Sequence, residues 1–375
     1  MEVSELVKKD ANLSFSRFRS LDEEELFRII SRAKDSLNKE LLILGHHYQQ
    51  DEIIQFAHER GDSFKLAQFA ASNKEKRYII FCGVHFMAES ADILTSDDQI
   101  VVLPDLSAGC SMADMADLWQ VEEAWDELSE ICSDNAVMPV TYMNSTADLK
   151  AFCGERGGIV CTSSNASAVL EWSFNQKEKV LFFPDQHLGR NTAKNMGIPL
   201  DQMIVWDPGK ELGGNGPDAI KRAKMILWNG YCSVHQIFTA AHVKYFREKY
   251  PGINIITHPE CKMEVVDLSD YCGSTEYIKK TISSAPSGTI WAIGTELNLV
   301  NRLKKENPDK HIYFLSPTVC FCSTMYRIDL PHLAWAIENL ASGIVINQIK
   351  VPLDVQHWAK VALERMLQVR GTGKL

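Results

Sequence analysis

Motifs that would readily explain a cysteine-rich sequence are missing from this chain of 375 residues. It has ten cysteines but no CxxC pair, no HExxH segment and no CxxxCxxC segment. A zinc hydrolase built on Cys232, His235 and His258 therefore lacks its usual sequence support. The radical S-adenosylmethionine class is set aside for the same reason. The cysteines need another explanation.

Segments that would direct the chain into or across a membrane are also missing from the sequence. No apolar run approaches the ~20 residues that span a bilayer, and Met1–Asp10 lacks the apolar core of a signal peptide. The net charge of −10 disfavours nucleic acid as the main partner. We expect a cytoplasmic protein without a membrane or nucleic-acid partner, in which cysteines are reduced thiols, metal ligands or small buried side chains.

Three successive blocks of the chain repeat one pattern of apolar runs. Within a block the runs alternate with stretches of helical length and end in turns rich in small or polar residues. This alternation predicts βαβ units, and near-continuous apolar runs predict parallel sheets covered by helices on both faces. A repeat on this scale predicts an α/β fold of three αβα (Rossmann-like) domains. The runs begin at Leu41, Tyr78 and Ile100, at Val137, Gly158 and Val180, and at Ile253, Thr289 and His311.

The repeat also predicts domain limits, with a single large doubly wound sheet as the alternative. We expect an N-terminal helical segment at 1–38 and αβα domains at 39–115, 116–235 and 236–334. The C-terminal segment 335–375 would complete the first domain. Closing helices are expected at Pro331–Leu340 and Asp354–Val369, with a returning strand within Ile344–Ile349. The Gly- and Pro-rich segment Asp207–Asp218 predicts a loop, either a lid or a plain surface loop.

Three of the cysteines occupy matching places in the three blocks. Cys110, Cys232 and Cys322 each follow an apolar run and a short turn, and each precedes a stretch that can open a helix. A helix N-terminus stabilises a thiolate. In parallel sheets functional residues gather past the carboxyl ends of the strands. Three αβα layers with their strand ends turned toward a common axis would bring these cysteines into one central cavity. A cubane iron–sulfur cluster normally takes four cysteines, so a set of three leaves one iron open as a Lewis acid.

A series of short motifs then carries a specific resemblance. In chain order these are GHHYQQDEI from Gly45, GDSFKLA, PVTYMNSTADLKA, CTSSNA, NGYCSVH, THPEC, CGST, GTE and a closing CxxM that ends at Met325. Together, from about Leu41 to Asp329, they resemble the quinolinate synthase family, the iron–sulfur enzymes of de novo NAD synthesis. The resemblance implies three αβα domains with pseudo-threefold symmetry around a central active site and a [4Fe–4S] cluster on three cysteines.

The resemblance also implies a reaction and partners. The reaction is condensation of iminoaspartate with dihydroxyacetone phosphate to quinolinate, with release of phosphate and two waters, and the open iron would act as Lewis acid. A functional link to the aspartate oxidase that makes iminoaspartate is implied as well, and a homodimer is left open. The rival hypothesis is an iron–sulfur electron-transfer or iron-sensing protein. Such a protein would want a fourth ligand and would not need tyrosines and a glutamate around its cluster.

The resemblance also implies which cysteines of this chain hold the cluster. Cys110 and Cys232 match the first two ligands of the family. The third region departs from the family pattern, because a CxC followed by Ser323 replaces the longer CxxCxxC segment. We choose Cys322, which lies three residues before a methionine as in the family, and we keep open that Cys320 pairs with it when the cluster is absent.

The remaining site residues follow from the same motifs. We expect Glu260 to be the general base with a pKa raised by burial, assisted in proton transfers by His258, Tyr48 and Tyr142. Glu260 and His258 lie two residues apart and share one face of an extended segment. The alternative for the hydroxyl residues is helix capping. Substrate contacts are expected from His46, Ser63, Tyr142, Asn144, Ser163, His258, Glu260, Ser274 and Thr275.

Overall fold

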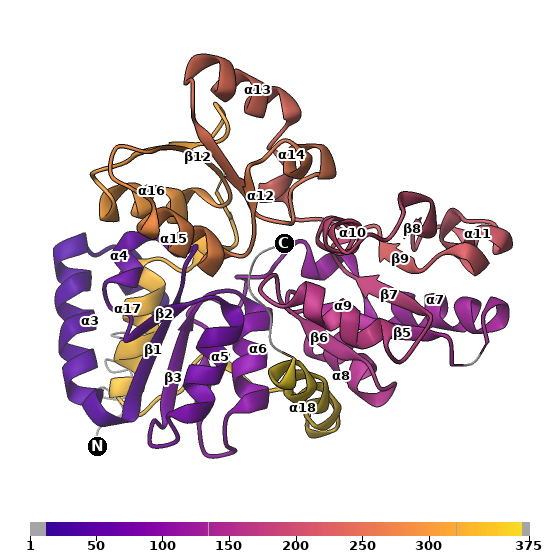
Figure 1. Cartoon of the computed structure of the whole chain (residues 1–375). Helices are drawn as coiled ribbons and strands as arrows, with labels where there is room; N and C mark the ends of the chain where they lie inside the picture. Colours follow the sequence, from indigo (N-terminus) through magenta and orange to yellow (C-terminus); the bar gives the residue numbers. More distant parts are fainter. Residues whose placement is uncertain (1–12, 134, 320, 370–375) are drawn as a thin grey trace. The chain divides into compact units, whose positions relative to one another are not determined.

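The computed structural model describes residues 13–133, 135–319 and 321–369. The chain is an α/β protein with three sheets that are parallel or mainly parallel, and helices alternate with the strands (Figure 1). The predicted fold class is confirmed. Two compact units divide the chain: the first runs up to Gly109 and adds Cys322–Val351, and the second comprises Cys110–Phe321 and the segment from Pro352. No helix in the described part of the chain is long and apolar enough to cross a membrane.

The first unit contains one five-stranded sheet in the order β14-β4-β3-β1-β2. All neighbouring strands are parallel except β14, which runs antiparallel to β4. The returning strand predicted within Ile344–Ile349 is thus confirmed for the last two residues of that range. The strands are β1 (Leu41–His46), β2 (Glu59–Gly61), β3 (Tyr78–Cys82), β4 (Ile100–Val102) and β14 (Gln348–Ile349). The helices are α2 (Phe15–Arg19), α3 (Glu23–Leu37), α4 (Asp51–Ile54), α5 (Ser63–Ser72), α6 (His85–Leu94) and α17 (Leu330–Ala341).

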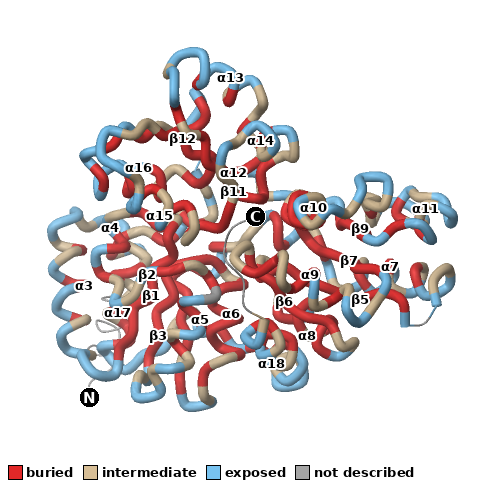
Figure 2. The backbone as a smooth tube through the Cα atoms, in the orientation of Figure 1, coloured by how far each residue is buried: buried red, intermediate tan, exposed pale blue. Residues whose placement is uncertain are grey.

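Helix α3 shows how local sequence sets these elements. The side chain of Asp22 accepts the N–H of Glu25 at 2.8 Å and caps the helix. Glutamates at the next three positions place negative charge at the positive end of the helix dipole. The buried face packs against α17, while the opposite face of the helix is exposed (Figure 2). That buried face consists of Leu26, Ile29, Ile30 and Ala33.

The second unit contains two wholly parallel sheets, in the orders β6-β5-β7-β9-β8 and β11-β10-β12-β13. Their strands are β5 (Val137–Tyr142), β6 (Ile159–Cys161), β7 (Lys179–Phe183), β8 (Met203–Trp206), β9 (Met225–Trp228), β10 (Asn254–Thr257), β11 (Tyr271–Cys272), β12 (Ile290–Gly294) and β13 (His311–Phe314). The α-helices are α7 (Leu118–Ile131), α8 (Ala147–Glu155), α9 (Ala166–Phe174), α10 (Gln186–Asn195), α11 (Pro217–Arg222), α12 (Ser233–Gln236), α13 (Ala240–Lys249), α14 (Met263–Asp267), α15 (Thr275–Ser284), α16 (Leu297–Glu306) and α18 (Leu353–Gln368).

The internal repeat is real, but the alignment of its second block was wrong. The orders β2-β1-β3-β4, β6-β5-β7-β9 and β11-β10-β12-β13 are equivalent. The strand β6 therefore corresponds to the edge strands β2 and β11, whereas the sequence interpretation matched it with β3 and β12. Sequence could not locate β2 and β11 because they have three and two residues and carry no apolar run.

The Gly- and Pro-rich segment 207–218 is held as an ordered loop. Glu127 on α7 accepts the backbone N–H of Leu212 with both carboxylate oxygens, at 3.2 and 3.1 Å. Gly213 has a φ of 62°, and a Cβ there would lie 2.4 Å from the indole of Trp206. The amide of Asn215 donates to the carbonyls of Leu212 and Gly213 in the same segment and to that of Val205 in β8. These contacts favour the plain surface loop over a lid.

Helix α18 packs closely on α8, which precedes it by about two hundred residues. A Cβ at Gly154 of α8 would lie 1.9 Å from the carbonyl oxygen of Trp358 on α18, so only glycine permits this approach. The guanidinium of Arg365 donates to the carbonyls of Gly154 and Gly158 at 3.1 and 2.7 Å. The last helix of the chain is thus part of the second unit.

Candidate active site

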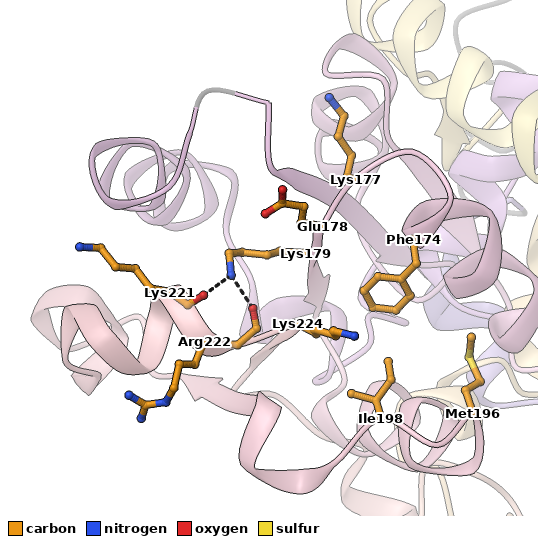
Figure 3. Close-up of a pocket in the computed structure, with 10 residues that line it drawn as sticks. Phe174, Lys177, Glu178, Lys179, Met196, Ile198, Lys221, Arg222 and Lys224 are labelled. Carbon is orange, nitrogen blue, oxygen red and sulfur yellow. Dashed lines mark hydrogen bonds between the residues drawn. The ribbon is translucent and has the colours of Figure 1, made fainter.

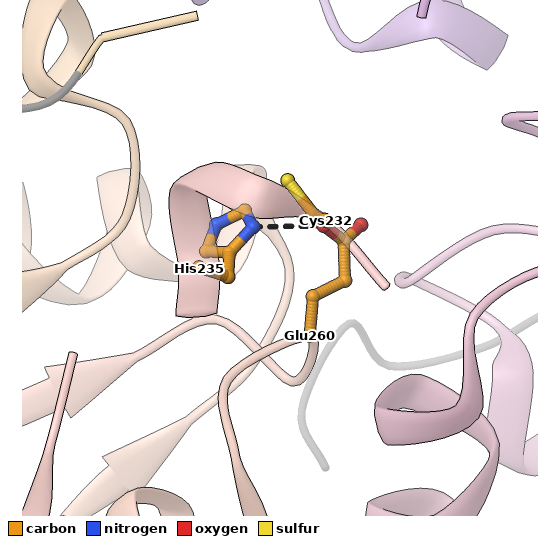
Figure 4. Close-up of side chains that lie close together, drawn as sticks. All are labelled: Cys232, His235 and Glu260. Atoms are coloured by element: carbon orange, nitrogen blue, oxygen red, sulfur yellow. Dashed lines mark ion pairs between the residues drawn. The ribbon is translucent and has the colours of Figure 1, made fainter. Parts of the chain in front are cut away.

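Strand ends of the second unit position a compact group of side chains. Tyr142 is the last residue of β5, and the turn after β10 carries His258 and Glu260. Cys232 is the N-cap of the short helix α12, which follows β9, and His235 lies one helical turn further on. Tyr142 and Cys232 lie at the carboxyl ends of parallel strands of one sheet, which end at the same edge. His258 and Glu260 follow β10 of the other sheet, and the hydrogen bond from Tyr142 to Glu260 joins the two sets. Figure 4 shows the side chains of Cys232, His235 and Glu260 converging.

The carboxylate of Glu260 is the centre of this group. Its Oε1 accepts the hydroxyl of Tyr142 at 2.7 Å, and its Oε2 lies 2.8 Å from Nδ1 of His235. Nδ1 of His258 lies 3.8 Å from Oε1, and the two imidazole rings stack with centroids 4.7 Å apart. All four side chains are buried. The structure thus brings together three of the four predicted catalytic residues.

The pKa of Glu260 differs from the prediction. Burial raises it, as expected from sequence, but the imidazoles of His235 and His258 and the hydrogen bond from Tyr142 outweigh burial. The pKa of Glu260 is consequently lowered to about 2. The predicted raised pKa was wrong because it did not include His235. Burial lowers the pKa of His258 to about 3, so this ring is neutral at neutral pH.

Neighbouring side chains that were not predicted as site residues hold this group in place. The amide of Asn191 on α10 donates to the carbonyls of Pro259 and Cys261, both at 2.8 Å, and so clamps the turn that carries Glu260. The amide of Gln236 donates to the carbonyl of Glu260 at 3.3 Å. Thr295 Oγ1 lies 3.2 Å from Nε2 of His235. Thr295 belongs to the GTE motif, which the sequence analysis had identified, whereas no motif in the sequence pointed to Asn191.

Asp185 links α10 to the loop of Cys232. It is the buried N-cap of α10, and its Oδ1 accepts the N–H of Leu188 at 2.7 Å. Burial and the nearby charge of Glu260 raise the pKa of Asp185, while hydrogen bonds from backbone N–H groups, including that of Cys232, act in the opposite direction. A strand-like bridge from Asp185 to Gly230 fixes the same loop. The backbone around Cys232 is therefore well supported.

The predicted metal ligands do not share one local structure. Cys232 opens an α-helix, as predicted. Cys110 and Cys322 are half-buried and are followed by 3₁₀ turns, at Ala113–Met115 and Met325–Arg327. The sequence predicted a helix after each of the three cysteines, and after Cys110 and Cys322 the first helix is of the 3₁₀ type. The helices begin later because Asp117 and Asp329 cap α7 and α17. Cys320 lies outside the described residues, so the choice of Cys322 as third ligand stays a prediction.

In the first unit, His46 and Tyr48 lie together at the end of β1. Nδ1 of His46 accepts the backbone N–H of Tyr48 at 3.2 Å, and the two rings meet edge to face with centroids 4.9 Å apart. Ser63 is the first residue of α5, whose cap is the carboxylate of Asp62. The hydroxyl of Ser63 is therefore not the capping group of its helix. The roles of these residues toward substrate stay predictions.

The predicted anion-binding residues of the second unit all follow strand ends. Asn144 and Ser163 are half-buried in the loops after β5 and β6. Ser274 is the N-cap of α15, and its hydroxyl accepts the N–H of Tyr277 at 3.3 Å. This is the capping role that the sequence left open. Thr275 is the buried first residue of the same helix.

A hollow of about 570 Å³ lies at the edge of the β6-β5-β7-β9-β8 sheet where β7 and β9 begin (Figure 3). This is the edge opposite to the strand ends that carry Tyr142 and Cys232. Its basic residues have structural roles, since Lys179 Nζ donates to the carbonyls of Lys221 and Ala223 at the end of α11, at 2.6 and 2.7 Å. Lys221 and Arg222 are in the last turn of that helix and point away from Phe174 in the figure. Cations there favourably oppose the helix dipole.

The fold and the group around Glu260 define an α/β enzyme whose thiol, imidazole and carboxylate at strand ends can hold a metal. Comparison with known proteins narrows this class. The NadA family model, described as quinolinate synthetase A protein, matches residues 28–368, and the chain belongs to this family. The resemblance recognised from sequence motifs is thereby confirmed.

Many relatives cover nearly the whole chain. A quinolinate synthase of Rhodopirellula baltica is 56% identical over 96% of this chain and 95% of its own length. The quinolinate synthase of Geobacillus sp. (strain WCH70) is 55% identical over 98% of this chain and 99% of its own length. That of Bacillus cereus (strain G9842) is 53% identical over 98% of this chain and 100% of its own length. The family is one of enzymes of NAD biosynthesis.

Proposed function

We propose that this protein condenses iminoaspartate with dihydroxyacetone phosphate to form quinolinate, phosphate and two waters. The observation that carries the proposal is the buried Tyr142–Glu260–His235 group beside Cys232. The proposed reaction balances in atoms and electrons without an oxidant or a reductant. Its chemical demands are proton transfers, loss of water and anion binding, and these suit the phenol, carboxylate and imidazoles of this site.

The proposed cofactor is a [4Fe–4S] cluster held by Cys110, Cys232 and Cys322. The chemistry of the side chains at Cys232 fits a metal group, because the thiol lies next to a buried imidazole and carboxylate. With three thiolate ligands, such a cluster supplies one Lewis-acidic iron with an open position. An electron carrier, the rival hypothesis, has no use for the Tyr142–Glu260 pair.

The chain's own residues have distinct tasks in this proposal. Glu260 is ionised at neutral pH, and its Oε1 receives protons that pass through the hydroxyl of Tyr142, 2.7 Å away. His258 is neutral and can donate or accept a hydrogen bond without adding charge. Tyr48 is the further proton-transfer candidate. Substrate carboxylate and phosphate oxygens are bound by His46, Ser63, Asn144, Ser163, Ser274 and Thr275.

The wider setting is proposed as well. The protein acts in the cytoplasm as a transferase that couples condensation to dehydration. It takes iminoaspartate from an aspartate oxidase, and a homodimer is the proposed assembly. Neither a nucleic acid nor a membrane takes part.

Anaerobic purification and a direct assay test the proposed function. The expected result is a brown protein with about four irons and four sulfides per chain that forms quinolinate from the two substrates. A protein with a reconstituted cluster that forms no quinolinate would refute the reaction. A protein that is active without iron would refute the cofactor.

A further inference from the structure

We propose that Cys232, His235 and Glu260 bind a single divalent cation of the zinc class when the cluster is absent (Figure 4). This site is distinct in its ligands from the three-cysteine cluster site and shares only Cys232 with it. The proposal goes beyond the reaction proposed above. It concerns the protein before cluster insertion or after cluster loss.

The three side chains are close enough to hold one ion. One ligand atom from each lies within 4.8 Å of those from the others. Four-coordinate zinc binds thiolate, imidazole and carboxylate at ~2.0–2.3 Å, which places neighbouring ligand atoms roughly 3.4 Å apart. The 2.8 Å between Nδ1 of His235 and Oε2 of Glu260 is slightly shorter than this. Small side-chain rotations therefore suffice to form the site.

The contact between Nδ1 of His235 and Oε2 of Glu260 brings two possible ligand atoms of one cation together. Although 2.8 Å apart, the two atoms are not aligned as donor and acceptor, and Nδ1 has no hydrogen-bond partner among the described residues. Nε2 of His235 lies 3.2 Å from the hydroxyl of Thr295. If the ring proton is on Nε2 and is donated to Thr295, Nδ1 carries a lone pair that can bind a cation beside the carboxylate. Metal-bound histidines are commonly oriented by such a second hydrogen bond.

The ligands are also held in advance. Tyr142 donates to Oε1 of Glu260 and leaves Oε2 directed at His235. Asn191 and Gln236 fix the backbone on either side of that carboxylate. Cys232 is the N-cap of α12 and His235 is the third residue of that helix, so one short element carries both ligands. Such preorganisation lowers the entropic cost of binding an ion.

Charge and chemistry select the kind of ion. A thiolate and a carboxylate carry two negative charges, and a divalent cation neutralises them in a site where His235 and Glu260 are 1% and 3% exposed. The thiol of Cys232 loses its proton to solvent when the ion binds. One soft sulfur, one imidazole and one carboxylate suit Zn²⁺ or Co²⁺ better than Mg²⁺ or Ca²⁺. The half-exposed Cys232 leaves room for water as the fourth ligand.

Because one thiolate cannot serve both sites, ion binding and cluster insertion exclude each other. The test uses full-length protein freed of iron by chelation under anaerobic, reducing conditions and titrated with Co²⁺. We expect one equivalent to bind, with the charge-transfer absorption of a cobalt–thiolate bond. Zn²⁺ should displace the Co²⁺ and should slow later cluster reconstitution.

Variants separate this site from the three-cysteine site. His235→Asn and Glu260→Gln should each weaken Co²⁺ binding by more than ~100-fold, since even residues behind the ligands contribute 10–100-fold. Thr295→Val should fall within that 10–100-fold range, while Cys110→Ser and the half-buried control Cys132→Ser should bind as the wild type does. If Cys110→Ser abolishes the cobalt–thiolate band and His235→Asn retains it, the ion is held by the three cysteines and the proposal is wrong. Thr295→Val keeps the test decisive should a ligand variant fail to fold.

Discussion

Replacing Glu260 by glutamine separates proton transfer from assembly of the site. The side chain keeps its size, and Oε1 of the amide can still accept the hydroxyl of Tyr142. The new NH₂ group takes the place of Oε2 beside Nδ1 of His235. We therefore expect Glu260→Gln to fold normally and to take up the proposed cluster, because the amide keeps the size of the carboxylate and the hydrogen bond from Tyr142.

Turnover should nevertheless fall steeply. Removal of a general base costs on the order of 10²–10⁴-fold, or about 3–5 kcal/mol of activation free energy. The loss of one buried charge-assisted hydrogen bond contributes about 1.5–3 kcal/mol to stability at most, so catalysis should suffer more than folding. Tyr142→Phe removes the hydroxyl but leaves the carboxylate, and it should show a smaller loss in turnover.

The assay is anaerobic quinolinate formation, with iron content and thermal unfolding measured on the same samples. Normal iron content with greatly reduced kcat is the expected result. Near-normal kcat in Glu260→Gln would remove Glu260 from proton transfer and leave His258 or Tyr48 as the base. A variant that lacks iron despite reconstitution would instead make Glu260 a residue of assembly.

Further predictions concern the cluster, the packing of the last helix and acid sensitivity. Replacing Cys110, Cys232 or Cys322 by alanine should abolish the visible absorption of the cluster, whereas Cys132→Ala should keep it. If Cys322→Ala retains this absorption and Cys320→Ala loses it, the choice of Cys322 as third ligand is wrong. Gly154→Ala places a methyl group 1.9 Å from a backbone oxygen of α18, so it should lower the free energy of unfolding by about 1–3 kcal/mol in urea titrations. Gly157→Ala is the comparison for backbone strain alone, because no atom lies within 4 Å of the added methyl group there but φ is 75°. Burial lowers the pKa of His58 from 6.5 to about 4, and the positive charges of Lys34 and Lys76 add to this shift. The stability that the neutral ring contributes is therefore present above pH 6.5 and is lost as the pH falls toward 4. Because His58 is exposed, we expect the loss to be only about 1 kcal/mol. His58→Asn should show a weaker decline between pH 7 and 5, and an unchanged decline would refute the assignment.

Much of the fold could be predicted because long apolar runs determine the central strands. Two edge strands could not be predicted, since β2 and β11 are too short to show an apolar pattern and pair only with β1 and β10. The antiparallel strand β14 was found because it follows a helix with clear amphipathic spacing.

The site shows the same division between local and distant information. Motifs at strand ends identified Tyr142, His258, Glu260 and Cys232, which are close in space. The pKa of Glu260 depends on His235, which approaches from another element, and its sign could not be read from the THPEC motif alone. Asn191 acts through contacts about seventy residues away in the chain, and a single sequence carries no signal for such contacts.

The order of segments along the chain has a consequence for biosynthesis. The first unit needs Cys322–Val351, whose strand β14 pairs with β4 and whose Val351 N–H is accepted by Asp92 at 2.8 Å. The second unit needs α18, which begins at Leu353. Ribosomes add about 5–20 residues per second, so the first unit stays incomplete for roughly 10–40 s while Cys110–Phe321 is synthesised. The second unit waits only for the shorter segment Cys322–Val351 before α18 is made.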